Sequence, residues 1–412
     1  MRRAARRLVA GVACLAVAGC GGRGGGDPAA KVVTTPTAKP ARTAAPDPLD
    51  DAGAIRALLA NRATALAALD ASAYAATAGG AQRARDRRAV KRAGRLAIER
   101  IRYVAHATRT AGDEATIAVR MSYGVRGIRR PFVTARRVTA RKLVDGWRVT
   151  RDVPRREPLP WEVAAFKAAR ARHVVLLTPP GVPAGPLRAG LTAAYREIRR
   201  DLPSRAMPER VLVIGARDAR QTERLSGRLG RGVLALANVS VSFEPGPSLE
   251  VRRVLGQRMI VVVSRFDALS PAEREMTLVH EMTHTALDPD MSGRIPPWLA
   301  EGVALYVSND DRTAEARALA AGAAPSIRLR SLCRPRSIRR RNGVEQGAAY
   351  AISSAAAYAI VARHGIKGLF ALYDAFDDAR IPGRPGPALT DRVLRRTLGM
   401  SLAELDAIAA GL

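Results

Sequence analysis

The segment that most constrains this chain is LVHEMTHTAL, residues 278–287, because it places two histidines inside a strongly predicted helix. Ser270 and Glu273 stand three residues apart with Pro271 between them. This pattern is a capping box with proline at the first helical position. The helix is therefore expected to begin at Pro271 and to run through at least Ala286.

His280 and His284 are four residues apart in that helix, so their imidazoles lie one turn apart on the same face. Two imidazoles in this arrangement can bind one metal ion, and HExxH is typical of zinc. Glu281 is rotated by roughly 100° from His280 and projects beside the ion, where it can accept a proton from water without being a ligand. The sequence therefore predicts a zinc site with Glu281 as general base.

A catalytic zinc is expected to have three protein ligands and one open position. Glu301 lies seventeen residues after His284, in IPPWLAEGVALYV, where Pro297 opens a second predicted helix. Asp290 lies six residues after His284, the spacing used by metzincins. That family has a glycine three residues after the second histidine, and Leu287 occupies this position here. Glu301 is therefore the predicted third ligand, and Asp290 is the alternative.

The HExxH segment followed by Trp298–Gly302, WLAEG, resembles the gluzincin metallopeptidases and, more narrowly, the peptidase-MA-like domains of bacteria. The likeness covers about Met259 to Leu412. It includes GAAYAISSAAAYAIVARHG, residues 347–365, which resembles the helix that follows the site in that family and ends at a glycine.

This resemblance implies a zinc-dependent endopeptidase or aminopeptidase-like hydrolase with a peptide or protein substrate. Carried over to this chain, the zinc ligands are His280, His284 and Glu301, and the general base is Glu281. In such enzymes a sheet strand just before the metal helix pairs with the substrate through its edge, and the strongly β segment Met259–Phe266 stands at this position.

Hydrolysis of an amide also needs a hydrogen-bond donor for the developing oxyanion. Tyr350 and Tyr358 are the candidates, eight residues apart on one predicted helix, although both positions also suit core aromatic residues. Asp288 follows the metal helix, where it either orients a histidine or simply ends the helix.

The N-terminus has the pattern of an export signal peptide. MRRAARRLVAGVACLAVAGC has a basic start, an apolar middle and small residues before Cys20. Its end, Val17-Ala18-Gly19-Cys20, resembles the lipobox of bacterial lipoproteins, which implies cleavage just before Cys20, with acylated Cys20 as the first mature residue. The expected location is the outer face of the bacterial cytoplasmic membrane, with the lipid as anchor. Residues 21–49 are rich in Gly, Pro, Thr and Ala, and are expected to form a flexible tether.

Residues 50–155 are predicted to form an α+β domain. An amphipathic helix comes first, with apolar residues at Ile55, Leu58, Leu59, Leu66 and Leu69. A basic helix near 83–94 follows. Four strands are then expected at Leu96–Ala107, Ala115–Val125, Phe132–Val144 and Trp147–Val153. Helices followed by an antiparallel meander resemble the cone-like domain of the nuclear-transport-factor-2 superfamily, for which we expect a structural or ligand-holding role.

Residues 160–412 are predicted to form the second domain, after a proline-rich connector at Pro154–Pro160. Strands at His173–Thr178 and Arg210–Gly215 flank a helix at Leu187–Asp201, and a mostly helical remainder follows. The expected fold class is α+β, with a zincin-like metallopeptidase domain whose C-terminal half is mostly helical.

The chain is strongly basic, with 68 Lys and Arg against 37 Asp and Glu, a formal net charge of +31. Six of the basic residues are lysine and 62 are arginine, which together with the many alanines indicates codon bias in a GC-rich genome. Such a surface attracts membranes and anionic envelope polymers. The run RPRSIRRR, residues 334–341, is either a contact for such polymers or a solvated loop. With few aromatic residues in stacking patterns, no specific nucleic-acid binding is expected.

Two rival functions remain open at this point. The chain could be a non-catalytic envelope lipoprotein that uses a gluzincin-like fold for binding, or a zinc hydrolase acting on a non-peptide amide. The complete set of His280, Glu281, His284 and Glu301 favours a peptidase. His106, His173 and His364 stand singly and are expected to be structural. Cys333 is the one thiol outside the first 20 residues, so no disulfide is expected after them.

Overall fold

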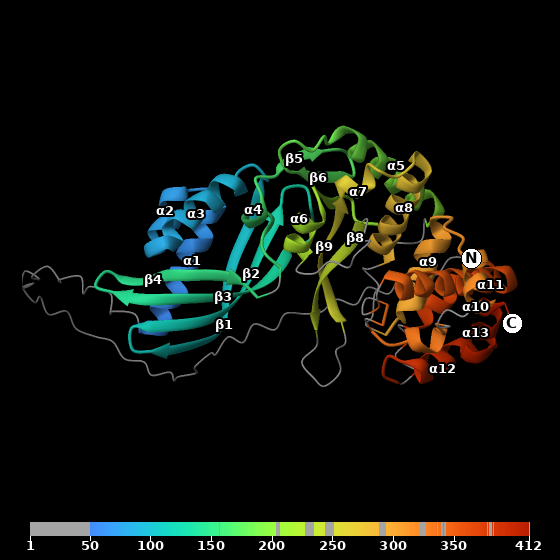
Figure 1. Ribbon diagram of the computed structural model, residues 1–412. Coiled ribbons are helices and arrows are strands. Elements are labelled where there is room, and N and C mark those ends of the chain that lie inside the picture. The colour runs from blue at the N-terminus through green and yellow to red at the C-terminus, as the bar shows by residue number, and fades with distance from the viewer. Residues whose placement is uncertain are drawn as a thin grey trace, which may run out of the picture. The chain divides into compact units, whose positions relative to one another are not determined.

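Three helices cover one face of a four-stranded antiparallel sheet in the first described part of the chain (Figure 1). The helices are α1 (Asp51–Ala67), α2 (Ala71–Ala76) and α3 (Gly80–Ala93). The strands are β1 (Ile98–Ala111), β2 (Glu114–Val125), β3 (Phe132–Leu143) and β4 (Gly146–Pro154), in the order β1-β2-β3-β4. This arrangement confirms the predicted helices and the antiparallel meander.

The computed structural model describes residues 50–155, 157–202, 207–226, 235–243, 251–287, 294–321, 327–335, 337–338, 341, 343–376, 378, 381 and 383–411, with backbone alone at 236–243, 251–255 and 321. The expected signal, Cys20, the tether, Asp288, Asp290 and part of the 334–341 run lie outside these residues. Among the described helices none is both long and apolar enough to cross a bilayer.

One residue of the predicted stripe on α1 behaves differently from the others. Ile55, Leu59 and Leu66 are buried against the sheet as expected. Leu69 was expected on the same buried face, and this was wrong. The helix ends at Ala67, and Leu69 takes a φ of 56° in the turn before α2, where its side chain is 38 % exposed.

The second sheet has five strands in the order β5-β6-β7-β9-β8. Three central strands are parallel and the two outer ones run antiparallel to their neighbours. Its elements are α4 (Pro160–Val163), β5 (Lys167–Arg170), β6 (Val174–Thr178), α5 (Gly185–Asp201), β7 (Val211–Ala216), α6 (Ala219–Ser226), β8 (Ala235–Phe243) and β9 (Val251–Val262). The predicted strand, helix and strand between His173 and Gly215 are confirmed.

Strand β9, which precedes the helix that carries His280 and His284, differs from its prediction in two respects. β9 ends at Val262, and Val263–Phe266 forms the short helix α7, so the expected strand Met259–Phe266 is strand only in its first half. β9 is also no edge strand, because β7 and β8 pair with its two sides. The edge of the sheet next to it is β8.

The remainder of the chain is helical, as predicted. It comprises α8 (Pro271–Leu287), α9 (Pro297–Val307), α10 (Thr313–Ala321), the 3₁₀ helix η2 (Leu329–Leu332), α11 (Gly343–Ala375), α12 (Pro387–Leu398) and α13 (Leu402–Ala410). Gly365, where the sequence predicted a helix end, has φ 66° and ψ 172° and interrupts α11. The overall class is α+β, as expected.

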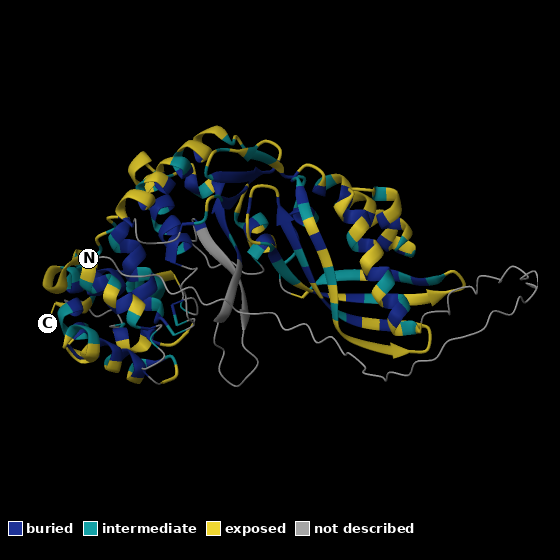
Figure 2. Ribbon diagram, turned by 180° about the vertical axis from the view of Figure 1, so that it is seen from behind, coloured by how far each residue is buried: buried dark blue, intermediate teal, exposed yellow. Residues whose placement is uncertain are grey.

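Buried side chains form three clusters, and Figure 2 shows them as dark bands on the helices and strands. The largest joins α5, α8, α9 and α11 with one face of the second sheet. A second cluster contains Tyr123 and Phe132 of the first sheet together with Trp161, Leu212 and Ile260. Apolar side chains from before and after the connector Pro154–Pro160 are therefore buried together in one cluster.

Candidate metal centre

Helix α8 begins as the sequence predicts. The Ser270 backbone N–H donates to Glu273 Oε2 at 2.8 Å, and the Glu273 N–H donates to Ser270 Oγ at 3.3 Å. Pro271 occupies the first helical position, where the missing N–H costs nothing. The reciprocal cap fixes the start of the helix, and hence the rotation at which its later residues face their neighbours.

The opposite side of α8 holds the helix in place. Leu278, Met282 and Ala286 are buried in the largest core cluster. Helix α5 approaches so closely that a Cβ at Gly190 would come within 2.9 Å of Leu278 Cδ1. Gln257 of β9 donates a hydrogen bond to the Thr285 carbonyl at 3.0 Å. Packing and this bond anchor the helix, while His280 and His284 remain half-buried.

Helix α9 presents Glu301, and the residues around it explain its WLAEG sequence. Trp298 and Leu299 are fully buried, which anchors the first turn. Gly302 lies against α11, where a Cβ would come within 2.6 Å of the Ser353 carbonyl oxygen. Only glycine allows the two backbones to approach this closely. The residue next to Glu301 thereby sets the distance between α9 and α11.

The three predicted ligands come together. The Nε2 atoms of His280 and His284 each lie 3.3 Å from Glu301 Oε2, and the two rings are 4.9 Å apart at 80° to one another. Their ligand atoms all lie within 4.8 Å of one another, and in the described part of the chain this is the one cluster of His, Cys, Asp or Glu that can hold a metal. Residues of two helices thus direct three ligand atoms at one point.

The distances fit zinc better than they fit hydrogen bonds. Zinc–nitrogen and zinc–oxygen bonds of about 2.0–2.1 Å at tetrahedral angles put neighbouring ligand atoms about 3.3–3.4 Å apart. A direct charge-assisted hydrogen bond between imidazole and carboxylate would be about 2.7–2.9 Å. Two nitrogens and one oxygen are also a ligand set that zinc uses at catalytic sites. The residues present therefore fit a zinc ion.

The carboxylate of Glu301 is held in its charged form. Partial burial alone would raise its pKa, but the adjacent imidazoles of His284 and His280 overcome this and place the pKa well below the ordinary range of a glutamate. A carboxylate that stays ionised through the physiological range is what a metal ligand requires.

Glu281 is buried on α8 and does not belong to the three-residue group. Its backbone carbonyl accepts a hydrogen bond from Thr285 Oγ1 at 3.1 Å. No side chain of the described residues forms an ion pair or hydrogen bond with its carboxylate. The separation from the ligand group matches the predicted role of a base beside the metal, and that role stays a prediction.

The two tyrosines make contacts near the end of α9. Tyr358 packs its ring edge-on against Tyr306 with centroids 4.9 Å apart, and burial raises its pKa to about 12. The Arg312 guanidinium lies 5.8 Å from the centre of the Tyr350 ring. These contacts explain both residues as packed aromatics, and an oxyanion role for either remains a prediction.

The single histidines have other surroundings. His173 stacks on Tyr195 with ring centroids 4.3 Å apart, and its Nδ1 lies 3.2 Å from the Glu209 carbonyl oxygen. His106 and His364 are exposed. Cys333 is buried and its thiol donates to the Leu329 carbonyl at 3.2 Å. The described part of the chain gives none of them a place in a metal-binding cluster.

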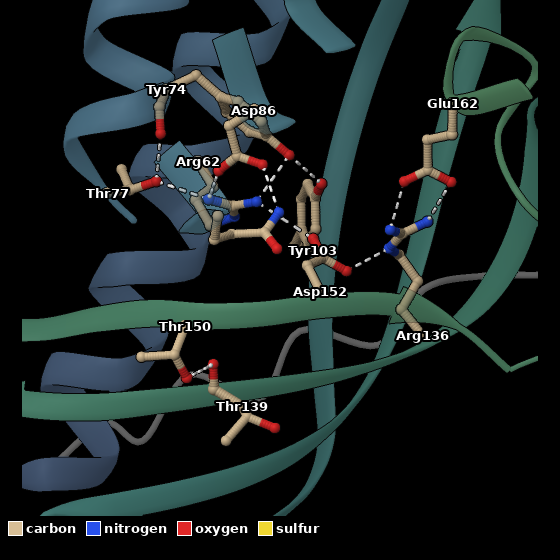
Figure 3. Close-up of polar contacts among 11 residues, drawn as sticks. Arg62, Tyr74, Thr77, Asp86, Tyr103, Arg136, Thr139, Thr150, Asp152 and Glu162 are labelled. Atoms are coloured by element: carbon tan, nitrogen blue, oxygen red, sulfur yellow. Dashed lines mark hydrogen bonds and ion pairs between the residues drawn. The ribbon is translucent and has the colours of Figure 1, made fainter. Parts of the chain in front are cut away.

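A second polar cluster, which the sequence analysis missed, lies inside the first region (Figure 3). Arg62 of α1 is fully buried and donates to Asp86 at 2.7 Å, to Asp152 at 3.2 Å and to the Tyr74 hydroxyl at 2.9 Å. Arg136, also buried, donates to Asp152 at 2.6 Å. The signal was present in the sequence, because Arg62 falls at a buried position of the apolar stripe on α1.

This cluster is neutralised by residues of the chain itself. Burial opposes the charge on Asp152, but Arg136 and Arg62 outweigh it and lower the pKa of the carboxyl. Arg136 also pairs with Glu162 at 2.6 Å, which ties α4 to the first sheet. Both arginines have carboxylate partners, so the cluster reads as a structural element and not as a metal or catalytic site.

Comparison with known proteins does not place the chain in a family. No model of a known protein family matches the chain. A search of curated proteins finds no significant relative. The site must therefore be interpreted from its own geometry and chemistry.

Proposed function

We propose that this protein is a zinc-dependent metallopeptidase. The observation that carries the proposal is the pair of 3.3 Å distances from Glu301 Oε2 to the two histidine Nε2 atoms, which equals the spacing of ligands around a tetrahedral zinc. The finer identity, a gluzincin-type enzyme of the peptidase-MA-like kind, rests on the resemblance of HEMTH and WLAEG and belongs to the same proposal.

The proposed roles follow from position. His280, His284 and Glu301 hold the ion, and bound zinc would acidify a water molecule and polarise the carbonyl of the scissile bond. Glu281, one residue after the first ligand, would act as the general base, which accepts a proton from the attacking water and returns it to the leaving amine.

The edge strand β8 supports a peptide as the substrate. Among the described strands it lies at the border of the five-stranded sheet and pairs with β9 alone, and it contacts helix α8. An extended peptide can add to such an edge through backbone hydrogen bonds, which aligns its carbonyls beside the site. This geometry favours a peptide over a small non-peptide amide.

The proposal also assigns roles to the N-terminal region and to Cys20. The region 50–155 would act as a cone-like support or ligand-holding domain, and acylated Cys20 with its tether would hold the enzyme on the outer face of the cytoplasmic membrane. The substrate would then be a peptide or protein at the cell envelope. The non-catalytic alternative differs in one respect, since it retains the fold but performs no hydrolysis.

The deciding experiment is the metal content of the fragment 50–412, purified without chelator and measured by elemental analysis. We expect about one zinc per chain, lost in His280→Ala and retained in the matched control His106→Ala, which removes an exposed histidine of β1. Absence of zinc in the folded fragment, even after zinc is added back, would overturn the proposal. Zinc binding without hydrolysis across a panel of peptides would favour the non-catalytic alternative.

A further inference from the structure

The uncovered face of the four-stranded sheet carries an array of arginines. Side chains on strands alternate between faces, and Figure 2 shows the alternation as bands of buried and exposed colour. One face, with Ile117 and Val138, is buried under α1. The opposite face, here called the outer face, exposes six arginines, namely Arg102, Arg109, Arg120, Arg137, Arg141 and Arg151.

The strand register spreads these arginines in two dimensions. Arg137 of β3 lies opposite Ala118 on one side and Val153 on the other, and Thr139, two residues on, lies opposite Thr116 and Arg151. Arg137 and Arg151 are thus diagonal neighbours, about 7–8 Å apart at Cα. Thr116, Arg137, Thr139, Arg151 and Val153 line a hollow of about 440 Å³.

The positive charge of this face is not balanced within the chain. Across the described residues, no ion pair or side-chain hydrogen bond involves Arg120, Arg137 or Arg151. Two carboxylates of the strands lie on the outer face, both near its ends: Glu114 is opposite Arg141, and Glu99 is opposite Gly124 and pairs with Arg100 at 3.2 Å. Arginines this close together repel one another, so an external anion would stabilise them.

The chemistry of the face favours phosphates without base stacking. The aromatic side chains of the four strands are Tyr103, Tyr123, Phe132 and Trp147, and each is buried or half-buried on the other side. A surface that binds single-stranded nucleic acid needs exposed aromatic rings on which bases stack. The outer face has guanidinium and hydroxyl groups instead, which suit phosphate oxygens.

The dimensions favour a planar ligand over a linear one. Four strands at about 4.8 Å make the face about 15 Å wide, and Arg102 and Arg109 are about 23 Å apart along β1. A linear polyanion would be matched by a stripe of charge, whereas a field of charge matches a layer of headgroups. We infer that the outer face docks on a lipid bilayer that contains anionic phospholipid, with the Arg137–Arg151 hollow receiving headgroup phosphates.

This inference does not depend on the proposed peptidase activity. It concerns a different surface, and zinc occupancy has no part in it. It would add a second membrane contact to the proposed lipid anchor. Docking through the sheet would also fix the orientation of the enzyme at the membrane, which a flexible tether cannot do.

The test is sedimentation of fragment 50–412 with lipid vesicles. Residues 49–412 form a compact unit that contains all three cores, so the fragment lacks only the anchor and tether. Vesicles contain phosphatidylcholine alone or with about one third phosphatidylglycerol. We expect binding to the anionic vesicles only, weakened about a hundredfold by Arg120→Gln/Arg137→Gln/Arg151→Gln.

The matched control removes the same charge elsewhere. Arg188, Arg196 and Arg199 are exposed on α5, so replacing all three with Gln changes the net charge equally. Binding should then fall by less than about threefold, and both variants should keep the wild-type melting temperature. Equal weakening by the two variants would overturn the inference in favour of general charge attraction. Binding to a soluble glycerol-phosphate polymer but not to vesicles would also overturn it and indicate an envelope polymer.

Discussion

Two polar clusters in this protein show how a self-neutralised arrangement of charge differs from one suited to a metal ion. In the first region, Arg62 and Arg136 are bonded to Asp86 and Asp152 at 2.6–3.2 Å in a buried network. In the second, His280, His284 and Glu301 face one another at 3.3 Å and are only half-buried. The first cluster pairs guanidinium cations with carboxylate anions. The second brings together two imidazole nitrogens and a carboxylate oxygen, all of which can donate a lone pair to a metal ion.

The difference concerns what each cluster needs in order to be stable. Carboxylates beside guanidinium groups satisfy one another, so the first cluster is complete within the chain. Two imidazole nitrogens and a carboxylate oxygen directed at one point are best satisfied by a cation placed between them. We therefore expect changes in the first cluster to affect folding, and changes in the second to affect metal binding and activity.

The largest expected effect is on catalysis. Glu281→Gln keeps the shape of the side chain but removes the base, so the rate of peptide hydrolysis should fall by about 10²–10⁴-fold or more. Zinc content and melting temperature should stay as in the wild type, because Glu281 lies outside the ligand group. Turnover of a peptide panel and elemental analysis measure both. Loss of zinc together with activity would make Glu281 a ligand and contradict the assignment.

For Asp152→Asn we expect the opposite, a loss of stability. This change leaves Arg62 and Arg136 without a common anion in a buried environment, and should lower the free energy of unfolding by about 3–5 kcal/mol. Urea unfolding of fragment 50–412 measures the loss. The control is Asp145→Asn, at an ion pair with Arg148 whose aspartate is 67 % exposed, which should change stability by less than about 1 kcal/mol. Similar values for the two variants would show that the network contributes little.

A smaller effect on the metal centre is expected from Gly302→Ala. The added Cβ would meet the Ser353 carbonyl oxygen at 2.6 Å, so α9 must move away from α11 and carry Glu301 with it. We expect zinc affinity to fall by about 10–100-fold, measured by competition with a chelating dye. Gly190→Ala is the control, because it crowds α8 through the flexible end of Leu278. An unchanged affinity in Gly302→Ala would show that the Glu301 position does not depend on this contact.

Local signals predicted most of the metal centre. The capping box at Ser270 and Glu273, the helical spacing of His280 and His284, and the proline that opens α9 each act within a few residues, and the structure bears them out. Glu301 could be chosen over Asp290 because its segment reads as a packed helix, and the geometry brings it to the histidines. Asp290 lies outside the described residues.

What the sequence did not reveal depended on contacts between distant segments. β9 was expected at an edge, but strand order is set by pairing with β7 and β8, which no short pattern contains. The Arg62 network joins α1, α3, β3 and β4, and its partners are up to 90 residues apart. Leu69 fitted the helical spacing of the stripe, yet the chain turns before it so that Asp70 can cap α2.

The smallest expected effect is on the pH dependence of stability, which tests whether the cluster around Asp152 is neutralised by its own arginines. Because the pKa of Asp152 is lower in the folded protein than its ordinary value near 4, its stabilising effect is fully present above about pH 4. It is lost as the pH falls through the folded-state pKa, where Asp152 becomes neutral and resembles Asn. The difference in unfolding free energy between wild type and Asp152→Asn should therefore be constant from pH 7 to 5 and should shrink toward pH 3.

Urea unfolding at pH 7, 5 and 3 measures this difference, with chelator present so that metal release from the histidines adds nothing. Comparison with Asp152→Asn cancels the other carboxylates whose pKa values are lowered, such as Asp391 and Glu404. A difference that stays constant down to pH 3 would mean that Asp152 binds protons equally in the folded and unfolded states, and would contradict the lowered pKa. A difference that vanishes already near pH 5 would contradict the lowered pKa and, with it, the view that this cluster is neutralised by its own arginines.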